Sequence, residues 1–131
     1  MSVLVDTSVW GEYFRNGNHY EKLDFFIDEN IVVTNDLILA ELIPFLKIRN
    51  QRKIIELLGA VQKLELVVDW DRLVENQYAC LKNGINGIGI PDLIIVQNAQ
   101  HNHCEIYSFD NHFQLMKDVL NIKLTSLTPD P

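Results

Sequence analysis

The chain contains little cysteine, little positive charge and no long apolar run. Its 131 residues include two cysteines, Cys80 and Cys104, which are far apart and form no Cys-x-x-Cys pair. A disulfide scaffold is therefore excluded, and a reducing compartment is favoured. No apolar run is long enough to cross a bilayer, and the first residues lack the basic region of a signal peptide. We expect a cytoplasmic protein that does not enter a membrane.

Several common functional motifs are also missing. The chain has no Gly-x-Gly-x-x-Gly dinucleotide fingerprint and no Gly-Lys-Ser/Thr phosphate loop. Its four histidines have no obvious serine or cysteine partner, and His101, His103 and Cys104 do not have the spacing of zinc ligands. The glycine-containing segment 83–91 is either a loop that moves over a site or a plain surface loop.

The pattern of the whole chain predicts one α/β domain over residues 1–131. Short apolar runs rich in branched residues alternate with longer helical segments, and 47% of the residues are hydrophobic. Such an alternation favours a three-layer α/β/α fold with a mostly parallel central sheet. Strands are expected at 3–5, 31–34, 64–67, 105–108 and 123–125. Helices are expected at 7–14, 20–28, 36–47, 51–63, 71–82, 91–102 and 111–119.

Four acidic residues lie at the edges of apolar segments. Asp6 and Asp110 follow predicted strands, Asp92 opens a predicted helix, and Glu41 lies inside an apolar helical segment. Asp6 and Asp92 could simply cap helices or complement their dipoles, and Asp110 could be a turn residue. Glu41 is harder to explain as a solvated residue, because the residues one turn away, Leu37 and Phe45, are apolar.

Together these acids predict a divalent-metal site outside the carboxyl ends of parallel strands. Mg²⁺ and Mn²⁺ take oxygen ligands, and one or two such ions can polarise a phosphodiester and help to ionise a bound water. We expect Asp6 and Asp92 to be direct ligands. Glu41 and Asp110 would complete a second position or orient water molecules.

Four segments resemble the PIN domain, most closely the VapC toxins of prokaryotic toxin–antitoxin pairs, over nearly the whole chain. They are Val5-Asp6-Thr7-Ser8-Val9-Trp10, Ala40-Glu41-Leu42, Pro91-Asp92-Leu93-Ile94-Ile95 and Ser108-Phe109-Asp110-Asn111-His112-Phe113. The resemblance implies a metal-dependent endoribonuclease and a small antitoxin partner that covers the site.

The same resemblance assigns residues. It makes Asp6, Glu41, Asp92 and Asp110 the acidic quartet, with Thr7, Ser108 and Asn111 around it. One departure is His112, which stands where many relatives have a second acid.

Charge argues against RNA binding, because the net charge of −7 would repel phosphates. Bound cations would offset the four acids. Beyond the Glu41 helix a basic cluster either follows a phosphate backbone or is a solvated helix junction. Its members are Lys47, Arg49, Arg52 and Lys53.

Other functions and partners stay open at this stage. A solitary PIN-domain RNA-processing nuclease and a non-catalytic RNA-binding or interaction domain are alternatives. A phosphatase with Asp6 as nucleophile is another, although Ser8 stands where its second aspartate is expected. The apolar segments 23–27 and 42–46 are expected to form a groove for an amphipathic antitoxin helix, and a homodimer or a hetero-oligomer is expected.

Overall fold

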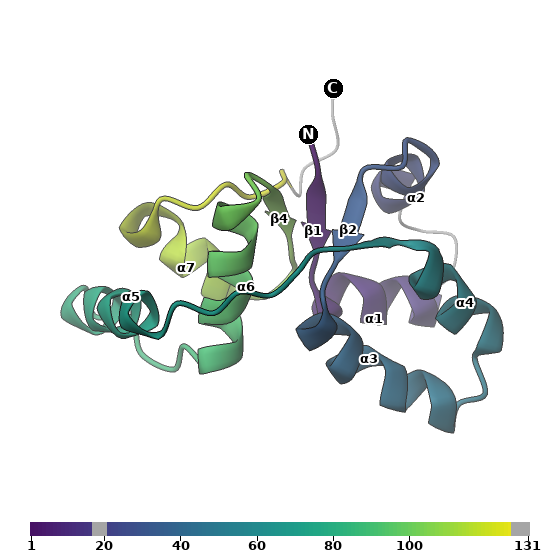
Figure 1. Ribbon diagram of the computed structural model, residues 1–131, viewed down its shortest axis with the longest axis horizontal. Coiled ribbons are helices and arrows are strands. Elements are labelled where there is room, and N and C mark those ends of the chain that lie inside the picture. The colour runs from purple at the N-terminus through teal and green to yellow at the C-terminus, as the bar shows by residue number, and fades with distance from the viewer. Residues whose placement is uncertain (17–20, 127–131) are drawn as a thin grey trace.

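The structure is a computed structural model that describes residues 1–16 and 21–126. Its centre is a parallel sheet whose strands form in the order β3-β2-β1-β4. The strands within the described residues are β1 (Val3–Val5), β2 (Val32–Thr34), β3 (Gln62–Lys63) and β4 (Glu105–Tyr107). The predicted mostly parallel α/β fold is thereby confirmed (Figure 1).

Helices connect and cover the strands, as the alternating pattern predicts. The described residues contain α1 (Thr7–Asn16), α2 (Glu21–Asp28), α3 (Asp36–Ile48), α4 (Arg52–Ala60), α5 (Trp70–Lys82), α6 (Ile90–His101) and α7 (Asn111–Leu120). Helix ends carry the expected signals. Asn35 caps α3 by accepting a hydrogen bond from the Ile38 amide at 2.9 Å, and Pro91 lies at the start of α6.

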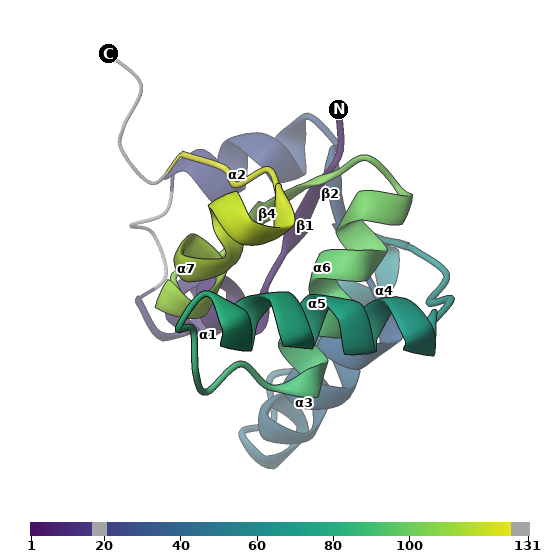
Figure 2. The same cartoon turned by 90° about the vertical axis from the view of Figure 1, so that its left-hand side faces the viewer.

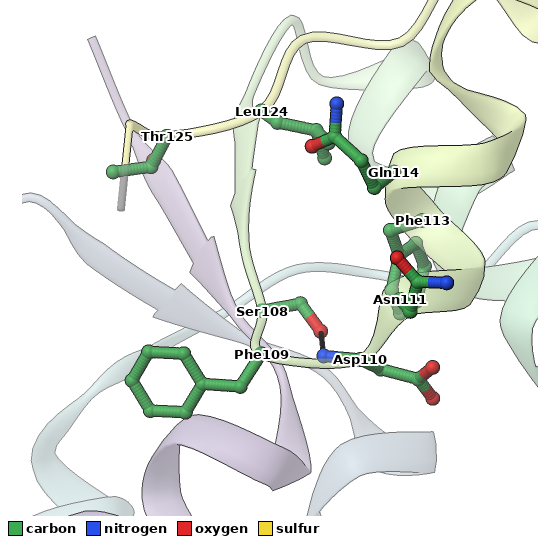
Figure 3. Close-up of a pocket in the computed structure, with 8 residues that line it drawn as sticks. All are labelled: Ser108, Phe109, Asp110, Asn111, Phe113, Gln114, Leu124 and Thr125. Atoms are coloured by element: carbon green, nitrogen blue, oxygen red, sulfur yellow. Dashed lines mark hydrogen bonds between the residues drawn. The ribbon is translucent and has the colours of Figure 1, made fainter. Parts of the chain in front are cut away.

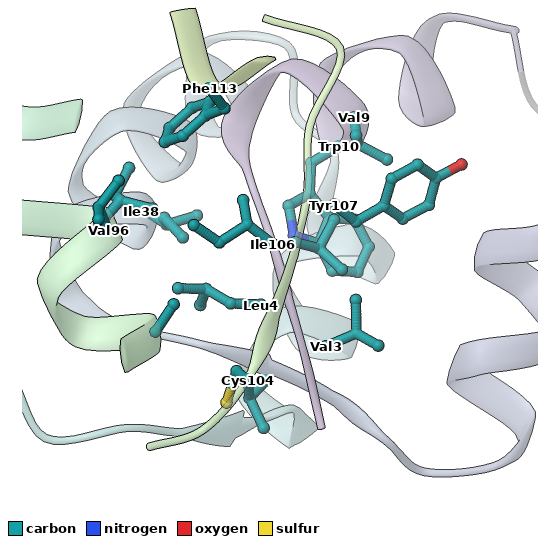
Figure 4. Packing of buried hydrophobic residues seen from close by; sticks show 14 of the residues in the cluster. Val3, Leu4, Val9, Trp10, Ile38, Val96, Cys104, Ile106, Tyr107 and Phe113 are labelled. Atoms are coloured by element: carbon teal, nitrogen blue, oxygen red, sulfur yellow. The ribbon is translucent and has the colours of Figure 1, made fainter. Parts of the chain in front are cut away.

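The two faces of the sheet are covered by different helices. Leu4 and Ile106 point toward Ile38, Val96 and Phe113, which lie on α3, α6 and α7 (Figure 4). In the same view Val3 and Tyr107 point the other way, toward Val9 and Trp10 of α1. Every residue of β1 is fully buried. A strand that is apolar on both faces is what a sheet covered on both sides requires.

The strand order creates a switch point beside β1. Strand β1 pairs with β2 on one side and with β4 on the other. The chain therefore builds β2 and β3 on one side of β1 and then returns to add β4 on the opposite side. In open α/β sheets the crevice at the carboxyl ends of such strands is where ligands bind. Asp6 directly follows β1, which places it at this crevice.

Two predicted strands were wrong in detail. The third strand is Gln62–Lys63, and the Leu64 amide still donates to the Thr34 carbonyl of β2 at 2.8 Å. Residues 65–69 then leave the sheet and cross to α5 (Figure 1), which lies at the front of Figure 2. Helix α4 is correspondingly shorter than the predicted 51–63. The predicted strand 123–125 is reduced to one parallel bridge between Leu124 and Ile106. Of the predicted helix 20–28, Tyr20 lies outside the described residues.

Buried amides explain why residues 65–69 leave the sheet. Asn98 donates to the carbonyl of Glu65 at 3.0 Å and accepts from the Asn35 side chain at 2.9 Å. Gln97 exchanges two hydrogen bonds with the backbone of Asp69, at 2.9 and 3.1 Å. These bonds occupy backbone groups that a longer strand would use in a ladder. We call Asn35, Gln97 and Asn98 the amide cluster.

The described helices include none that is both long and apolar enough to span a membrane.

Candidate active site

The four predicted acids come from four different elements around the switch point. Asp6 follows β1, Glu41 lies in α3, Asp92 is in the first turn of α6, and Asp110 caps α7 just after β4. We call these four residues the acid cluster. Asp6 and Asp110 are therefore brought to the same edge of the sheet by two adjacent parallel strands.

Asp6 is held by serine hydroxyls. Its residue is only 6% exposed, and its Oδ2 accepts hydrogen bonds from Ser8 Oγ at 2.9 Å and Ser108 Oγ at 2.8 Å. A helix cap would instead accept from backbone amides in the first turn of α1. The carboxylate is thus fixed by side chains from two segments about one hundred residues apart, an anchoring that capping a helix does not require.

The two serines also fix the loop that carries Asp110. Ser108 Oγ accepts from the Asp110 amide at 2.9 Å, a bond drawn in Figure 3, and Ser8 Oγ accepts from the Phe109 amide at 3.0 Å. Ser108 was among the predicted surrounding residues, but Ser8 was not. Its signal was present in the sequence, because a serine two residues after a strand-ending aspartate begins a helix and lies close to that carboxylate.

Asp92 and Asp110 face each other across the histidine that departs from the family pattern. His112 Nδ1 lies 3.3 Å from Asp92 Oδ2 and 3.4 Å from Asp110 Oδ1. One donor atom from each of these three residues lies within 4.8 Å of the others, which is close enough to hold one metal ion. Asp110 also keeps its ordinary role, since its Oδ1 caps α7 at the His112 amide, 2.9 Å away.

Electrostatics link the acids to one another. Burial raises the pKa of Asp92, the charge of Asp110 and more weakly that of Asp6 raise it further, and His112 opposes the shift. Glu41 is exposed as a residue, yet its carboxyl is partly desolvated at the mouth of the site. That desolvation raises the pKa of Glu41, as do Asp6 and Asp92. A weak contact with the Thr7 hydroxyl, short of full hydrogen-bond geometry, lowers the same pKa in part.

The surroundings of Glu41 differ from the prediction. Phe45, one turn along α3, is 67% exposed, so the face of α3 that carries Glu41 is open and not packed into the core. Glu41 is nevertheless close enough to Asp6 and Asp92 for their charges to raise its pKa. The acid belongs to the site because of these neighbours and not because it is buried.

The remaining predicted residues lie around the cluster or beyond it. Asn111 is exposed at the start of α7 and lines a small pocket of about 140 Å³ with Ser108, Phe109 and Asp110 (Figure 3). The basic cluster occupies the junction of α3 and α4, and all of its members are exposed. They are Lys47, Arg49, Arg52 and Lys53.

The glycine-containing loop 83–89 delivers Asp92 to the site. Gly84 and Gly87 have φ angles of 77° and 81°, values that residues other than glycine rarely adopt. Gln77 Nε2 donates to the Ile88 carbonyl at 3.0 Å and fixes the end of the loop to α5. The loop is therefore anchored just before α6 begins.

Fold and site together define an α/β protein with an acidic centre at the switch point of a parallel sheet. The chain belongs to the PIN domain family, whose model matches residues 3–119. A comparison with curated proteins found no match.

Solved structures share the fold at low sequence identity. The structure is similar to DNA-bound VapBC from Salmonella typhimurium, with a TM-score of 0.75 and 14% identity over 95% of this chain and 97% of that chain. It is equally similar to VapBC2 from Rickettsia felis bound to a promoter DNA fragment, with a TM-score of 0.75 and 19% identity over 95% and 98%. FitAcB from Neisseria gonorrhoeae follows, with a TM-score of 0.66 and 19% identity over 95% and 96%.

Proposed function

We propose that the protein is a divalent-metal-dependent endoribonuclease that hydrolyses RNA phosphodiesters, and that it is the toxin of a toxin–antitoxin pair. The observation that carries the proposal is the convergence of Asp6, Glu41, Asp92 and Asp110 at the switch point of the sheet. Membership of the PIN domain family and the likeness to VapBC structures support it.

The residues present suit Mg²⁺ or Mn²⁺. The donors are carboxylate oxygens, which hard divalent cations prefer. Within the described residues no lysine or arginine forms an ion pair with any of the four acids. Burial and mutual repulsion raise the pKa of Glu41 and of Asp92, and a cation would reverse the effect of the repulsion. We assign Asp6 and Asp92 as the direct ligands, with Glu41 and Asp110 as the next candidates.

The chain's own residues then have separate tasks. A bound ion of this kind polarises the phosphodiester and lowers the pKa of a coordinated water. Ser8 and Ser108 hold one oxygen of Asp6, leaving its other oxygen for the ion. Glu41, with its raised pKa, is suited to accept a proton from an attacking water at the mouth of the site.

The protein has a net charge of −7, which would repel the phosphates of RNA, so positive charges must offset the negative charge near the site. The basic cluster on the α3–α4 junction supplies four exposed positive charges just beyond the Glu41 helix. We assign Lys47, Arg49, Arg52 and Lys53 to the phosphate backbone of the substrate. Their substitution should weaken binding more at low salt than at high salt.

Exposed aromatic rings support an antitoxin partner. Phe25 of α2 and Phe45 of α3 are 57% and 67% exposed, and we propose that an amphipathic helix of the antitoxin covers them. Fewer residues than predicted are available for this contact, because Leu23, Leu42 and Leu46 are buried in the core. An arginine from the same partner would suit the acid cluster, since its planar fork binds carboxylates bidentately.

An apolar stripe on α5 supports a homodimer. Trp70, Val74, Tyr78 and Leu81 recur at helical spacing, and each is between 54% and 70% exposed. Such a stripe would be buried by the same stripe of a second copy around a two-fold axis. Val74→Glu should then convert a dimer to a monomer in sedimentation equilibrium, whereas Glu75→Lys on the same helix should not.

Cleavage of a defined single-stranded RNA tests the catalytic proposal. The wild type with Mn²⁺ should cleave it, chelation should stop cleavage, and Asp6→Asn or Asp92→Asn should lower the rate about 100-fold or more, because several kcal/mol of charge stabilisation are lost. Asp71→Asn is the matched control, because Asp71 occupies the first turn of α5 as Asp92 does that of α6. Full activity of both site variants would refute the proposal.

Growth separates the toxin from a solitary processing nuclease. Expression of the wild type should arrest growth, Asp92→Asn should not, and co-expression of the neighbouring gene product should restore growth. Harmless expression of an active, folded wild type would support the solitary nuclease. Metal-independent RNA binding without cleavage would support the non-catalytic domain.

A further inference from the structure

His112 presents an unsatisfied nitrogen to two acids of the site. Its Nδ1 is buried and has no hydrogen-bond partner within residues 1–16 and 21–126. It lies 3.3 Å from Asp92 Oδ2 and 3.4 Å from Asp110 Oδ1. Charge-assisted hydrogen bonds between a protonated nitrogen and a carboxylate are shorter, about 2.7–2.9 Å. The imidazole nitrogen is thus near both carboxylates at distances longer than such bonds.

This spacing suits three donors that share one ion. Two ligands at right angles, each about 2.1–2.2 Å from a metal, are separated by about 3.0 Å. The observed separations are only slightly larger, so a small inward movement of the side chains would complete the set. The other ring nitrogen, Nε2, lies beside Gly87, where an added Cβ would be 4.0 Å from it. The ring therefore directs Nδ1, and not Nε2, into the site.

We propose that His112 Nδ1 is a metal ligand alongside Asp92 and Asp110, and that it makes this site prefer Mn²⁺ over Mg²⁺. The inference rests on the proposed function, because it assigns the metal of the same site. Mn²⁺ binds nitrogen more weakly than the later first-row transition-metal ions do, but it accepts an imidazole more readily than Mg²⁺, which prefers oxygen donors and dehydrates reluctantly. A carboxylate at this position would supply another oxygen and remove that discrimination.

The position of His112 explains why a single ring has this effect. It is the second residue of α7, and its amide donates to Asp110 Oδ1 at 2.9 Å. The backbone of one ligand is thereby fixed to the side chain of another. Coordination through Nδ1 requires the neutral ring to carry its proton on Nε2, the nitrogen that points at the glycine-containing loop.

Pulsed electron paramagnetic resonance of bound Mn²⁺ tests the proposal without any measurement of cleavage. The wild-type protein with Mn²⁺ alone should show nitrogen hyperfine coupling, and His112→Asp should lose it while still binding Mn²⁺. His101→Asp is the matched control, because His101 is exposed at the far end of α6 and should leave the coupling intact. Competition with Mg²⁺ should show that His112→Asp lowers the preference for Mn²⁺ about tenfold.

The outcomes separate this inference from the proposed function. Bound Mn²⁺ without nitrogen coupling in the wild type would overturn the role of His112 and leave an all-oxygen nuclease site intact. Absence of Mn²⁺ and Mg²⁺ binding in a folded wild type would overturn both proposals. If His112→Asp fails to fold, as judged by circular dichroism, His112→Asn removes the ring nitrogen without adding charge, and the same loss of coupling is expected.

Discussion

Two polar clusters lie close to the carboxyl ends of the strands, and they are built in opposite ways. The amide cluster is buried, and each of its three side chains is hydrogen-bonded to backbone or to another amide. The acid cluster repels itself, which contributes to the raised pKa of Asp92 and of Glu41. A closed network of neutral groups contributes to stability, whereas a cluster of like charges lowers stability until a ligand completes it.

Hydrogen-bond partners within the fold distinguish a structural buried polar residue from a candidate functional one. Asn98 and Asp92 lie on the same helix, less than two turns apart, and both are at least partly buried. Asn98 has its partners within the fold, so its role is structural. Asp92 has two like charges nearby, and they raise its pKa although His112 opposes them, so its surroundings do not satisfy its charge as those of Asn98 satisfy its amide.

Asn98→Ala should cause the largest loss of stability. The change leaves the buried Asn35 side-chain amide without its partner, which costs about 1–3 kcal/mol, and also removes the bond to the carbonyl of Glu65, an exposed residue. We expect the free energy of unfolding in urea to fall by about 2–4 kcal/mol. Asn102→Ala is the control, because Asn102 is exposed and loses only one bond, to the Asn98 carbonyl. Equal effects of the two changes would show that the amide cluster does not hold the crossing segment 65–69.

Bound Mn²⁺ should stabilise the acid cluster, as internal hydrogen bonds already stabilise the amide cluster. Binding to the folded state alone stabilises by about 2.7 kcal/mol at a concentration one hundred times the dissociation constant. We expect thermal unfolding to shift upward with Mn²⁺ in the wild type and not in Asp92→Asn. Asn98→Ala, although less stable, should keep the full upward shift. A shift in Asp92→Asn as large as in the wild type would place the ion elsewhere.

The positions of the four acids were easier to predict from the sequence than the residues that contact them. Aspartates at the ends of apolar runs are visible because folding alone does not explain four of them, and the fold did bring them to one edge. Ser8 escaped notice because a serine at the start of a helix is ordinary. The contribution of His112 depends on the distance between α6 and α7, which no local pattern encodes.

The fold was predictable where a strand is buried on both faces and less so at the edges of the sheet. Strands β1 and β2 are short runs of branched residues that are buried throughout, and β4 buries Ile106 and Tyr107. Residues 64–67 have the same composition, but Val67 is 60% exposed and the chain there follows the amides of α6. Tertiary hydrogen bonds overrode local propensity at this segment.

Asp92→Asn should stabilise the metal-free protein, in contrast to the same change elsewhere. Removing the charge removes both the cost of burying a carboxylate and the repulsion from Asp110. We expect the free energy of unfolding to rise by about 1 kcal/mol near neutral pH. Asp71→Asn, in the first turn of α5, should instead lose about 0.3–1 kcal/mol of helix-dipole interaction. Urea unfolding in the presence of a chelator measures both. A loss in both variants would mean that Asp92 only complements the dipole of α6.

The smallest effect is the pH dependence that Glu41 contributes. Because its pKa is raised above the ordinary 4.5, the folded metal-free protein binds this proton more tightly than the unfolded chain does. Stability from this group is therefore greatest below pH 4.5 and falls as the pH rises through the higher folded pKa.

Glu41→Gln removes that dependence. The difference in unfolding free energy between Glu41→Gln and wild type should thus grow in favour of the variant across this interval and stay constant above it. Saturating Mn²⁺ should reduce or reverse the difference, because a cation favours the charged carboxylate. Glu56→Gln on the exposed surface of α4 should show neither effect. A pH-independent difference at position 41 would remove Glu41 from the acid cluster and leave Asp6, Asp92 and Asp110 as its members.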